Sequence, residues 1–329
     1  MKIAYLIMAH ENPQLLQRTI RTLSYGDSEC AFFIHLDRKT PFEPFSSVCG
    51  QNVHFLEERL PVYWGEVSQV EAILSLVREA MASPNRYDYC VLITGSCYPL
   101  RTGRYIASFL EMNRGVEYMD ILKAPSPGKP IARFNTIRYP STQPVRRFLF
   151  RALAKVGLAE RNHRKYFGGL EAYSGDGAWA LTRDACQYVL DFESANPHLQ
   201  KYFQRTFAPD EAFVHTILGN SKFRNRIRRN LVYAIWPGPT NGHPALITQE
   251  HVLRFEAQGQ VSGNRMYGPG ELVFARKFND RNLDVVASVD AMIERKEGVR
   301  LPASVDARDR VCAMGEVGDG GVQSQDRGR

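Results

Sequence analysis

Short apolar runs alternate with amphipathic segments through the first 120 residues of the chain. A strand covered on both faces carries apolar side chains at nearly every position, so such runs predict strands at 3–9, 31–37, 53–56 and 89–94. Apolar residues recur every three or four positions over 13–23 and 68–81, which predicts two helices. Asn12 is the expected N-cap of the first helix, and Pro13 its first helical residue. The alternation predicts an α/β fold.

The pattern changes after residue 120. Many Arg and Lys side chains and five prolines fall within 121–170, which predicts long loops and a short helix; we name its charged part, residues 133–165, the basic segment. Ordered structure is expected again as a glycine-rich turn at 175–177, a short strand at 178–181 and helices over 184–192 and 212–218. Residues 303–329 contain few apolar side chains and predict a disordered tail.

Charge and cysteine usage narrow the function classes. Lys and Arg number 42 against 35 Asp and Glu, a net charge of +7 that suits an anionic small molecule, a membrane surface or nucleic acid. Nucleic acid is disfavoured, because no recognition-helix or RNP pattern accompanies the aromatic residues of the basic segment. The six cysteines lack metal-ligand spacing, and no apolar stretch is long enough to span a bilayer. With no evident signal peptide, we expect a cytoplasmic protein with reduced thiols.

The commonest motifs of nucleotide-binding proteins and hydrolases are absent from the sequence: the glycine-rich dinucleotide fingerprint, the P-loop, the HExxH pair and the GxSxG elbow. Ligands of open α/β sheets bind at the carboxyl ends of the strands. The residues expected there are His10, Asp37, Trp64 and the pair Gly95-Ser96.

Seven motifs follow one another between residues 4 and 278. They are the strand 4–10, Phe33-Ile34-His35-Leu36-Asp37, Val62-Tyr63-Trp64-Gly65 with Ser68, 92–100 with Gly95-Ser96-Cys97-Tyr98-Pro99, 173–183, Thr206-Phe207-Ala208-Pro209-Asp210-Glu211, and Phe274-Ala275-Arg276-Lys277-Phe278. In this order they resemble the core-2/I-branching β-1,6-N-acetylglucosaminyltransferase family with its peptide O-xylosyltransferase relatives, and the chain looks like a soluble, bacterial-type member.

The resemblance implies a GT-A-like, Rossmann-type nucleotide-sugar fold, built as a single large domain with a mixed central sheet. Residues 1–120 would form the half that binds the nucleotide-sugar, and residues 121–300 the catalytic and acceptor-binding half. Members of the family use a UDP-sugar, invert the anomeric centre and need neither a divalent metal nor another cofactor. These properties are expectations for this chain.

Two residues carry the implied chemistry. An attacking hydroxyl must lose its proton, and a carboxylate at hydrogen-bond distance can accept it. The resemblance places the catalytic base at Glu211, although the bare pattern equally suits a solvated carboxylate at a helix start. The departing diphosphate needs positive charge, which fixed cations supply as well as a metal does. The resemblance assigns this role to Lys277, which otherwise would be part of a solvated pair with Arg276.

The remaining site residues are assigned by their place in the motifs. Donor contacts are expected from His10, Asp37, Gly95, Ser96 and Arg276, and acceptor contacts from Trp179, Trp236 and Asp210. Structural roles are the alternatives: a lone His, a turn-starting Asp and a core Trp are all common. Trp64 and Trp179 could each stack on a sugar, and the motif favours Trp179.

Two positions depart from the family pattern. Cys97 replaces an aspartate, and Ala245 falls where relatives carry an arginine. Either the alignment is shifted at Ala245, or Arg254, Arg265 or Arg276 supplies the charge, or the protein is a weak or inactive relative.

The sequence therefore predicts an inverting, metal-independent glycosyltransferase that moves a sugar from a UDP-sugar to a glycan hydroxyl. GlcNAc is the first choice of sugar. A UDP-xylose-dependent xylosyltransferase and a non-catalytic glycan- or nucleotide-binding relative are the alternatives. The expected acceptor is a glycan, including lipid-linked or envelope glycans, with peripheral membrane contact through the basic segment 133–165 and no nucleic acid partner.

Overall fold

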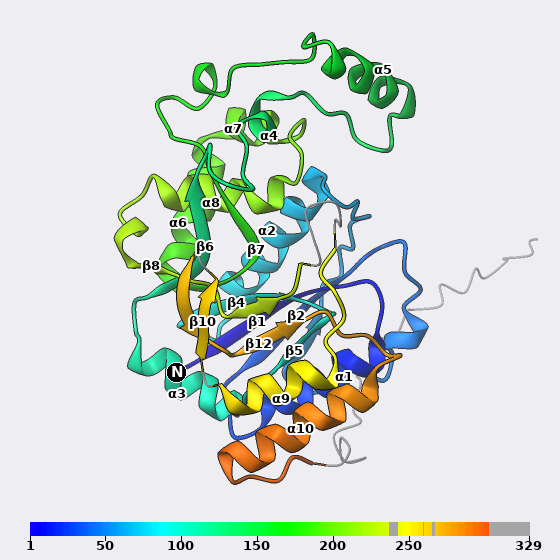
Figure 1. The fold of residues 1–329 in the computed structure, drawn as a ribbon, viewed down its shortest axis with the longest axis vertical. Coiled ribbons are helices and arrows are strands. Elements are labelled where there is room, and N and C mark those ends of the chain that lie inside the picture. The colour runs from blue at the N-terminus through cyan, green and yellow to red at the C-terminus, as the bar shows by residue number, and fades with distance from the viewer. Residues whose placement is uncertain (237–242, 259, 265–266, 303–329) are drawn as a thin grey trace, which may run out of the picture.

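A mixed seven-stranded sheet forms the centre of the computed structural model, which describes residues 1–236, 243–258, 260–264 and 267–302 (Figure 1). The strand order is β3-β2-β1-β4-β7-β6-β8. Strands β1, β2, β3 and β4 run parallel to one another, and β7 runs antiparallel to its neighbours β4 and β6. The strands are β1 (Ile3–Ala9), β2 (Ala31–Leu36), β3 (Val53–Phe55), β4 (Tyr89–Thr94), β6 (Glu117–Lys123), β7 (Tyr173–Thr182) and β8 (Ile227–Arg228).

Helices cover both faces of this sheet, because alternate side chains of the buried strands point to opposite sides. Ala4 and Leu6 belong to the apolar core under α2 (Val67–Ala82), α6 (Arg183–Ala195), α7 (Pro197–Phe203) and α8 (Phe213–Gly219). Tyr5 and Ile7 belong to the core under α1 (Pro13–Ser24) and α3 (Gly103–Met112). The predicted α/β fold, a single domain with a mixed central sheet, is confirmed.

The C-terminal part of the chain adds two small sheets and two helices beside the central sheet. Strands β9 (Val232–Ala234), β12 (Phe274–Arg276) and β5 (Cys97–Pro99) form a small sheet, and β10 (Gln260–Asn264) pairs with β11 (Gly268–Glu271). Helices α9 (Gln249–Ala257) and α10 (Leu283–Glu297) share a third apolar core, and α10 accepts a hydrogen bond from the Tyr98 hydroxyl at Asp290 (2.5 Å). This packing carries Arg276 and Lys277 to the strand ends.

The basic segment forms the end of the molecule farthest from α9 and α10 (Figure 1). It contains α4 (Ala132–Asn135, begun one residue before the segment), α5 (Pro144–Lys155) and the 3₁₀ turn His163–Lys165. Further 3₁₀ turns lie at Glu43–Phe45, Pro209–Glu211 and Arg224–Arg226. Among the described helices, none has both the length and the apolar character needed to cross a bilayer.

The structure corrects one local prediction and adds detail at two other places. Residues 175–177 are not a turn but the interior of β7; Gly175 is required there because a Cβ would lie 1.6 Å from the backbone oxygen of Asp120 on β6. Residues 97–99, named from the sequence only as part of a motif, form strand β5, whose partner β12 is distant in sequence. Asn12 is the N-cap residue of α1, as predicted, but its side chain makes no capping hydrogen bond; it accepts instead from the Asp280 backbone N–H (3.1 Å). The predicted tail, 303–329, lies outside the described residues.

Candidate active site

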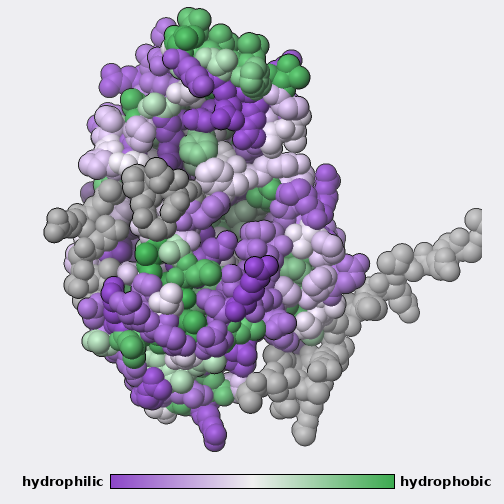
Figure 2. Space-filling model, turned by 45° about the vertical axis from the view of Figure 1, so that its right-hand side comes forward, coloured by the Kyte–Doolittle hydropathy of each residue, from purple (hydrophilic) through white to green (hydrophobic). Residues whose placement is uncertain are grey.

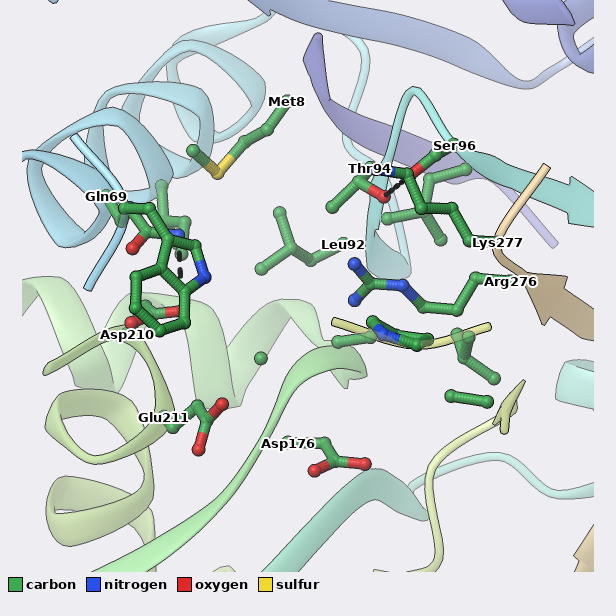
Figure 3. Close-up of a pocket in the computed structure, with 18 of the residues that line it drawn as sticks. Met8, Gln69, Leu92, Thr94, Ser96, Asp176, Asp210, Glu211, Arg276 and Lys277 are labelled. Atoms are coloured by element: carbon green, nitrogen blue, oxygen red, sulfur yellow. Dashed lines mark hydrogen bonds between the residues drawn. The ribbon is translucent and has the colours of Figure 1, made fainter. Parts of the chain in front are cut away.

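A pocket of about 340 Å³ opens at the carboxyl ends of β1, β2 and β4. Most of the residues predicted for the site line this pocket: His10, Asp37, Ser96, Asp210, Glu211, Trp236, Arg276 and Lys277. Segments from 8 to 277 therefore meet in one cavity. Figure 3 shows Arg276 and Lys277 entering from one side, and Asp176, Asp210 and Glu211 lying on the opposite side.

Two predicted residues do not line the pocket. Trp179 is 3% exposed and packs in the core under α2, so the prediction that it contacts the acceptor is wrong in position. The sequence offered Trp64 as the other candidate, and Trp64 is 60% exposed and does line the pocket. Gly95, the second predicted residue that does not line the pocket, lies in the turn after β4. Its N–H donates to Met8 O (2.8 Å), and a Cβ added to it would lie 3.4 Å from the Ala9 Cβ.

Glu211 is held by two cations from residues that precede it by about 80 positions. Its Oε2 accepts from Arg133 Nη1 at 2.5 Å and from Lys129 Nζ at 3.0 Å. Lys129 also donates to Gly175 O (2.5 Å), which ties the group to β7. Burial alone would raise the pKa of Glu211, but Lys129 and Arg133 outweigh it and hold the pKa below its ordinary value. Glu211 is therefore ionised at neutral pH and oriented into the pocket.

The neighbouring acids behave in the opposite way. Burial, followed by repulsion from Glu211, raises the pKa of Asp210 to about 7. Gln69 Nε2 donates to its Oδ2 at 3.4 Å, while Oδ1 is buried without a partner among the described residues. Burial also raises the pKa of Asp176, despite the opposing effect of Lys129. At neutral pH this side of the pocket thus holds one firmly ionised carboxylate, Glu211, beside two carboxyl groups that carry protons more readily.

The opposite side of the pocket is cationic. Lys277 Nζ lies 3.3 Å from Glu11 Oε1, and Arg276 presents a buried Nε with no partner among the described residues. The backbone of Lys277 donates to Ala245 O (3.2 Å), which places Ala245 beside the pocket. Of the alternative cations, Arg254 is exposed and paired with Glu250, and Arg265 lies outside the described residues. Arg276 is the alternative that the fold brings to the site.

The strand ends supply further polar groups. Lys39 Nζ contacts Asp37 Oδ2 at 2.6 Å. Burial raises the pKa of Asp37, but hydrogen bonds and charge from Lys39 lower it further, so the net pKa is depressed. His10 is exposed and lies 3.7 Å from Glu11. Ser96 Oγ lies 3.1 Å from Thr94 Oγ1, within reach of a ligand at the end of β4.

Several residues of the site escaped prediction. Lys129 precedes the basic segment and Arg133 opens it, both within the cation-rich stretch 121–170, and nothing in the local pattern shows that they turn inward. Asp176 was assigned to a turn. His215, on α8, is fully buried and supports β7 through a hydrogen bond from Nε2 to Asp176 O (3.0 Å); burial lowers its pKa to about 3, so it is neutral. Its partner is a backbone atom, which no side-chain motif reveals.

The part of the chain that the structure describes contains no group of three His, Cys, Asp or Glu side chains placed to hold a metal. Cys97, a departure from the pattern of the family that the sequence resembles, is 1% exposed, and its Sγ lies 3.4 Å from Thr94 Oγ1. The charged groups that face the cavity can neutralise an anion on the Arg276 and Lys277 side and accept a proton at Glu211. Metal independence stays a prediction.

Comparison with known proteins adds the family. The Core-2/I-Branching enzyme family model matches residues 3–256. Xylosyltransferase 2 of Homo sapiens is 24% identical over 238 residues, covering 67% of this chain and 25% of that protein. The N-acetyllactosaminide β-1,6-N-acetylglucosaminyl-transferase of Mus musculus is 24% identical over 220 residues, covering 65% of this chain and 52% of that protein.

The chain thus matches about a quarter of the length of the xylosyltransferases and about half of the N-acetylglucosaminyltransferase. Among solved structures, the galactosyltransferase LgtC in complex with donor and acceptor sugar analogues aligns over 92% of this chain and 98% of that chain, at 10% identity and a TM-score of 0.38.

Proposed function

The chain belongs to the core-2/I-branching enzyme family, and on that basis we propose that it is an inverting, metal-independent glycosyltransferase. It moves a sugar from a UDP-sugar to a hydroxyl of a glycan acceptor. The observation that carries the proposal is the arrangement of Glu211 and Lys277, which lie on opposite sides of one pocket at the strand ends (Figure 3).

The acceptor hydroxyl attacks the anomeric carbon from the carboxylate side of the pocket. The acceptor hydroxyl donates its proton to Glu211 while its oxygen bonds to the anomeric carbon. Arg133 and Lys129 occupy Oε2 of this carboxylate, and among the described residues none hydrogen-bonds to Oε1, which leaves that oxygen for the acceptor. The depressed pKa makes Glu211 a weak base, so the two cations act chiefly by fixing its direction.

The cation side of the pocket receives the leaving group. As the bond between the anomeric carbon and phosphate breaks, its electron pair goes to the UDP oxygen. Lys277 and Arg276 stabilise that charge, a role in which preorganised cations in a partly dehydrated pocket are effective. Attack from the Glu211 side and departure toward the Lys277 side give inversion. The nucleotide lies across the strand ends, near His10, Asp37 and Ser96.

The acceptor is proposed as a class of molecule, whereas the donor is proposed as one of two named UDP-sugars. We propose a glycan acceptor, free or carried on an envelope lipid, reached from the cytoplasm. Trp64 and Trp236, 60% and 48% exposed at the rim of the pocket, offer aromatic faces for a sugar ring. UDP-GlcNAc is the proposed donor and UDP-xylose the alternative, since the described pocket residues do not separate them.

A donor screen tests the proposal directly. Thermal unfolding is followed with a panel of UDP-sugars in EDTA, and a ligand that binds the folded state raises the midpoint by mass action. We expect UDP-GlcNAc to raise it and Mn²⁺ to add nothing to binding or to transfer. Strict dependence of transfer on Mn²⁺ would contradict the mechanism.

The base is tested separately. Glu211→Gln keeps the shape of the side chain and removes its basicity, so turnover should fall by at least about 100-fold while UDP binding persists. Glu171→Gln, which changes an exposed glutamate paired with Lys123, is the matched control. Near-normal turnover of Glu211→Gln would move the base to another group.

A non-catalytic, UDP- or glycan-binding protein is the second candidate. Two observations favour it: the depressed pKa of Glu211, and Cys97 and Ala245, the two departures from the family pattern that the resemblance implies. Calorimetric UDP binding without transfer to any acceptor across the donor panel would support this candidate, and robust transfer would remove it.

A further inference from the structure

Helix α5 (Pro144–Lys155) contributes no buried residue to the protein. Large apolar side chains project from it and from the residues that follow it. Their exposed fractions are 80% for Val145, 77% for Phe148, 51% for Leu149, 67% for Val156 and 72% for Leu158. In the space-filling view, hydrophobic side chains gather at this end of the molecule (Figure 2).

All of these side chains except Leu158, which lies beyond the helix, form a single stripe. At 3.6 residues per turn, Val145, Phe148, Leu149, Ala152 and Val156 fall within roughly 100° of the helix circumference. The other side of α5 meets the rest of the protein. There Phe150 packs on Tyr139 with ring centroids 4.5 Å apart, and Arg147 lies 3.5 Å from Glu66. The apolar stripe therefore faces away from the body.

The charge of this region has one sign. Residues 121–159 include eight Lys and Arg and no Asp or Glu. Some of these cations point inward: Lys129 and Arg133 contact Glu211, and Arg138 lies over the Phe207 ring. Arg151 and Lys155 are exposed on α5 along one edge of the stripe, where they also border the cavity between α5 and the body. An apolar stripe beside cations is the pattern of a helix that lies in the surface of an anionic membrane.

We propose that α5 docks the protein on an anionic lipid bilayer, with Val145, Phe148 and Leu149 inserted among the headgroups and Arg151 and Lys155 on the lipid phosphates. A neutral protein partner would not account for an unbroken run of positive charge, and a second copy of this chain would set like charges against each other. The proposal narrows the predicted membrane contact from the whole basic segment to one helix face.

Docking through α5 would also bring the candidate active site close to an acceptor carried by the membrane. A second cavity of about 580 Å³ lies between α5 and the body, lined by Arg147, Phe150, Arg151 and Lys155. Trp64 lines both this cavity and the candidate active site. A membrane-borne acceptor could therefore extend from the bilayer to Glu211. The docking itself does not require the proposed reaction, so the two can fail independently.

Vesicle flotation of the full chain tests the apolar stripe. Wild-type protein should float with vesicles of phosphatidylglycerol and phosphatidylcholine mixed, and poorly with phosphatidylcholine alone. The triple variant Val145→Ser, Phe148→Ser, Leu149→Ser should bind at least about tenfold more weakly. Met112→Ser with Leu253→Ser removes side chains that are 79% and 66% exposed on α3 and α9, and should bind like the wild type. Circular dichroism melts check that each variant folds.

The charge half of the proposal is tested with Arg151→Gln and Lys155→Gln together. Binding should weaken by about tenfold, and its dependence on salt should flatten. Lys222→Gln with Arg281→Gln makes the same change of net charge at exposed positions elsewhere and should have little effect. Equal binding to neutral vesicles would overturn the proposal. A second result would also overturn it: wild-type protein that does not bind vesicles but forms a dimer by light scattering, where the triple variant is a monomer.

Discussion

Arg133 Nη1 and Glu211 Oε2 lie 2.5 Å apart, joining the start of the basic segment to the candidate catalytic base. The side chains of both residues are largely shielded, with 13% of Arg133 and 24% of Glu211 exposed. A charge pair at this depth is less screened by solvent than a surface pair. The ionisation of Glu211 is therefore governed by residues outside its own motif.

The first prediction concerns pH. Because Arg133 favours the charged carboxylate, Arg133→Gln should raise the pKa of Glu211. The base form is lost as pH falls through this pKa, so the acidic limb of kcat/KM should move to higher pH in the variant. Rate–pH profiles of wild type and variant measure the shift. Arg146→Gln, an exposed substitution on α5, is the control, and an acidic limb that stays in place in Arg133→Gln would separate Glu211 from the rate.

The second prediction concerns the leaving group. Removing one charge that stabilises a developing anion costs about 10²–10³ in kcat. Lys277→Ala and Arg276→Ala should each show a loss of this order. Arg254→Ala should leave kcat unchanged, because Arg254 is exposed and pairs with Glu250. Steady-state kinetics with saturating donor decide the matter, and a full rate in Lys277→Ala would assign the charge to another group.

The central strands and helices were predictable because their sequence signals are local. Ile3–Ala9 and Tyr89–Thr94 are apolar at nearly every position, as expected for strands buried on both faces, and their observed bounds agree with prediction. The pairing of β5 with β12 was not predictable, since it joins Cys97 to Arg276 across the chain. Local patterns encode period and burial, whereas partners distant in sequence are chosen by tertiary packing.

The same limit explains what was missed in the site. Lys129 and Arg133 belong to a cation-rich stretch that looks solvated, and only the fold shows that they converge on Glu211. Trp64 and Trp179 were both candidates to stack on a sugar. The motif favoured Trp179, yet Trp179 lies on a central strand whose two faces are covered, so it is core.

The third prediction separates these two tryptophans. Trp64 is 60% exposed and contacts Phe207 and His243 at ring-centroid distances of 5.5 and 5.6 Å. Trp64→Ala should raise the acceptor KM with little change in the unfolding midpoint. Trp179→Ala leaves a cavity in the core and should reduce the free energy of unfolding by about 3–5 kcal/mol. Kinetics and urea melts of both variants check the contrast, which would be contradicted by destabilisation in Trp64→Ala alone.

The fourth prediction concerns the stability of the protein against pH. Burial, followed by repulsion from Asp176, raises the pKa of Asp120 to about 7, and its Oδ1 accepts from the Asn230 N–H at 2.9 Å. A carboxyl whose pKa is higher in the folded state than in the unfolded state favours folding while protonated. That contribution is complete below the ordinary Asp pKa and is lost as pH rises to about 7.

Asp120→Asn keeps the oxygen that Asn230 contacts and cannot ionise. Relative to wild type it should therefore gain about 1–3 kcal/mol in the free energy of unfolding between pH 4 and pH 8. Urea unfolding at both pH values measures the difference. Asp191→Asn, at an exposed position on α6, should follow the wild-type pH dependence. Parallel pH profiles for wild type and Asp120→Asn would mean that Asp120 is already ionised in the folded protein at pH 4, with its charge stabilised by Asn230 and nearby cations.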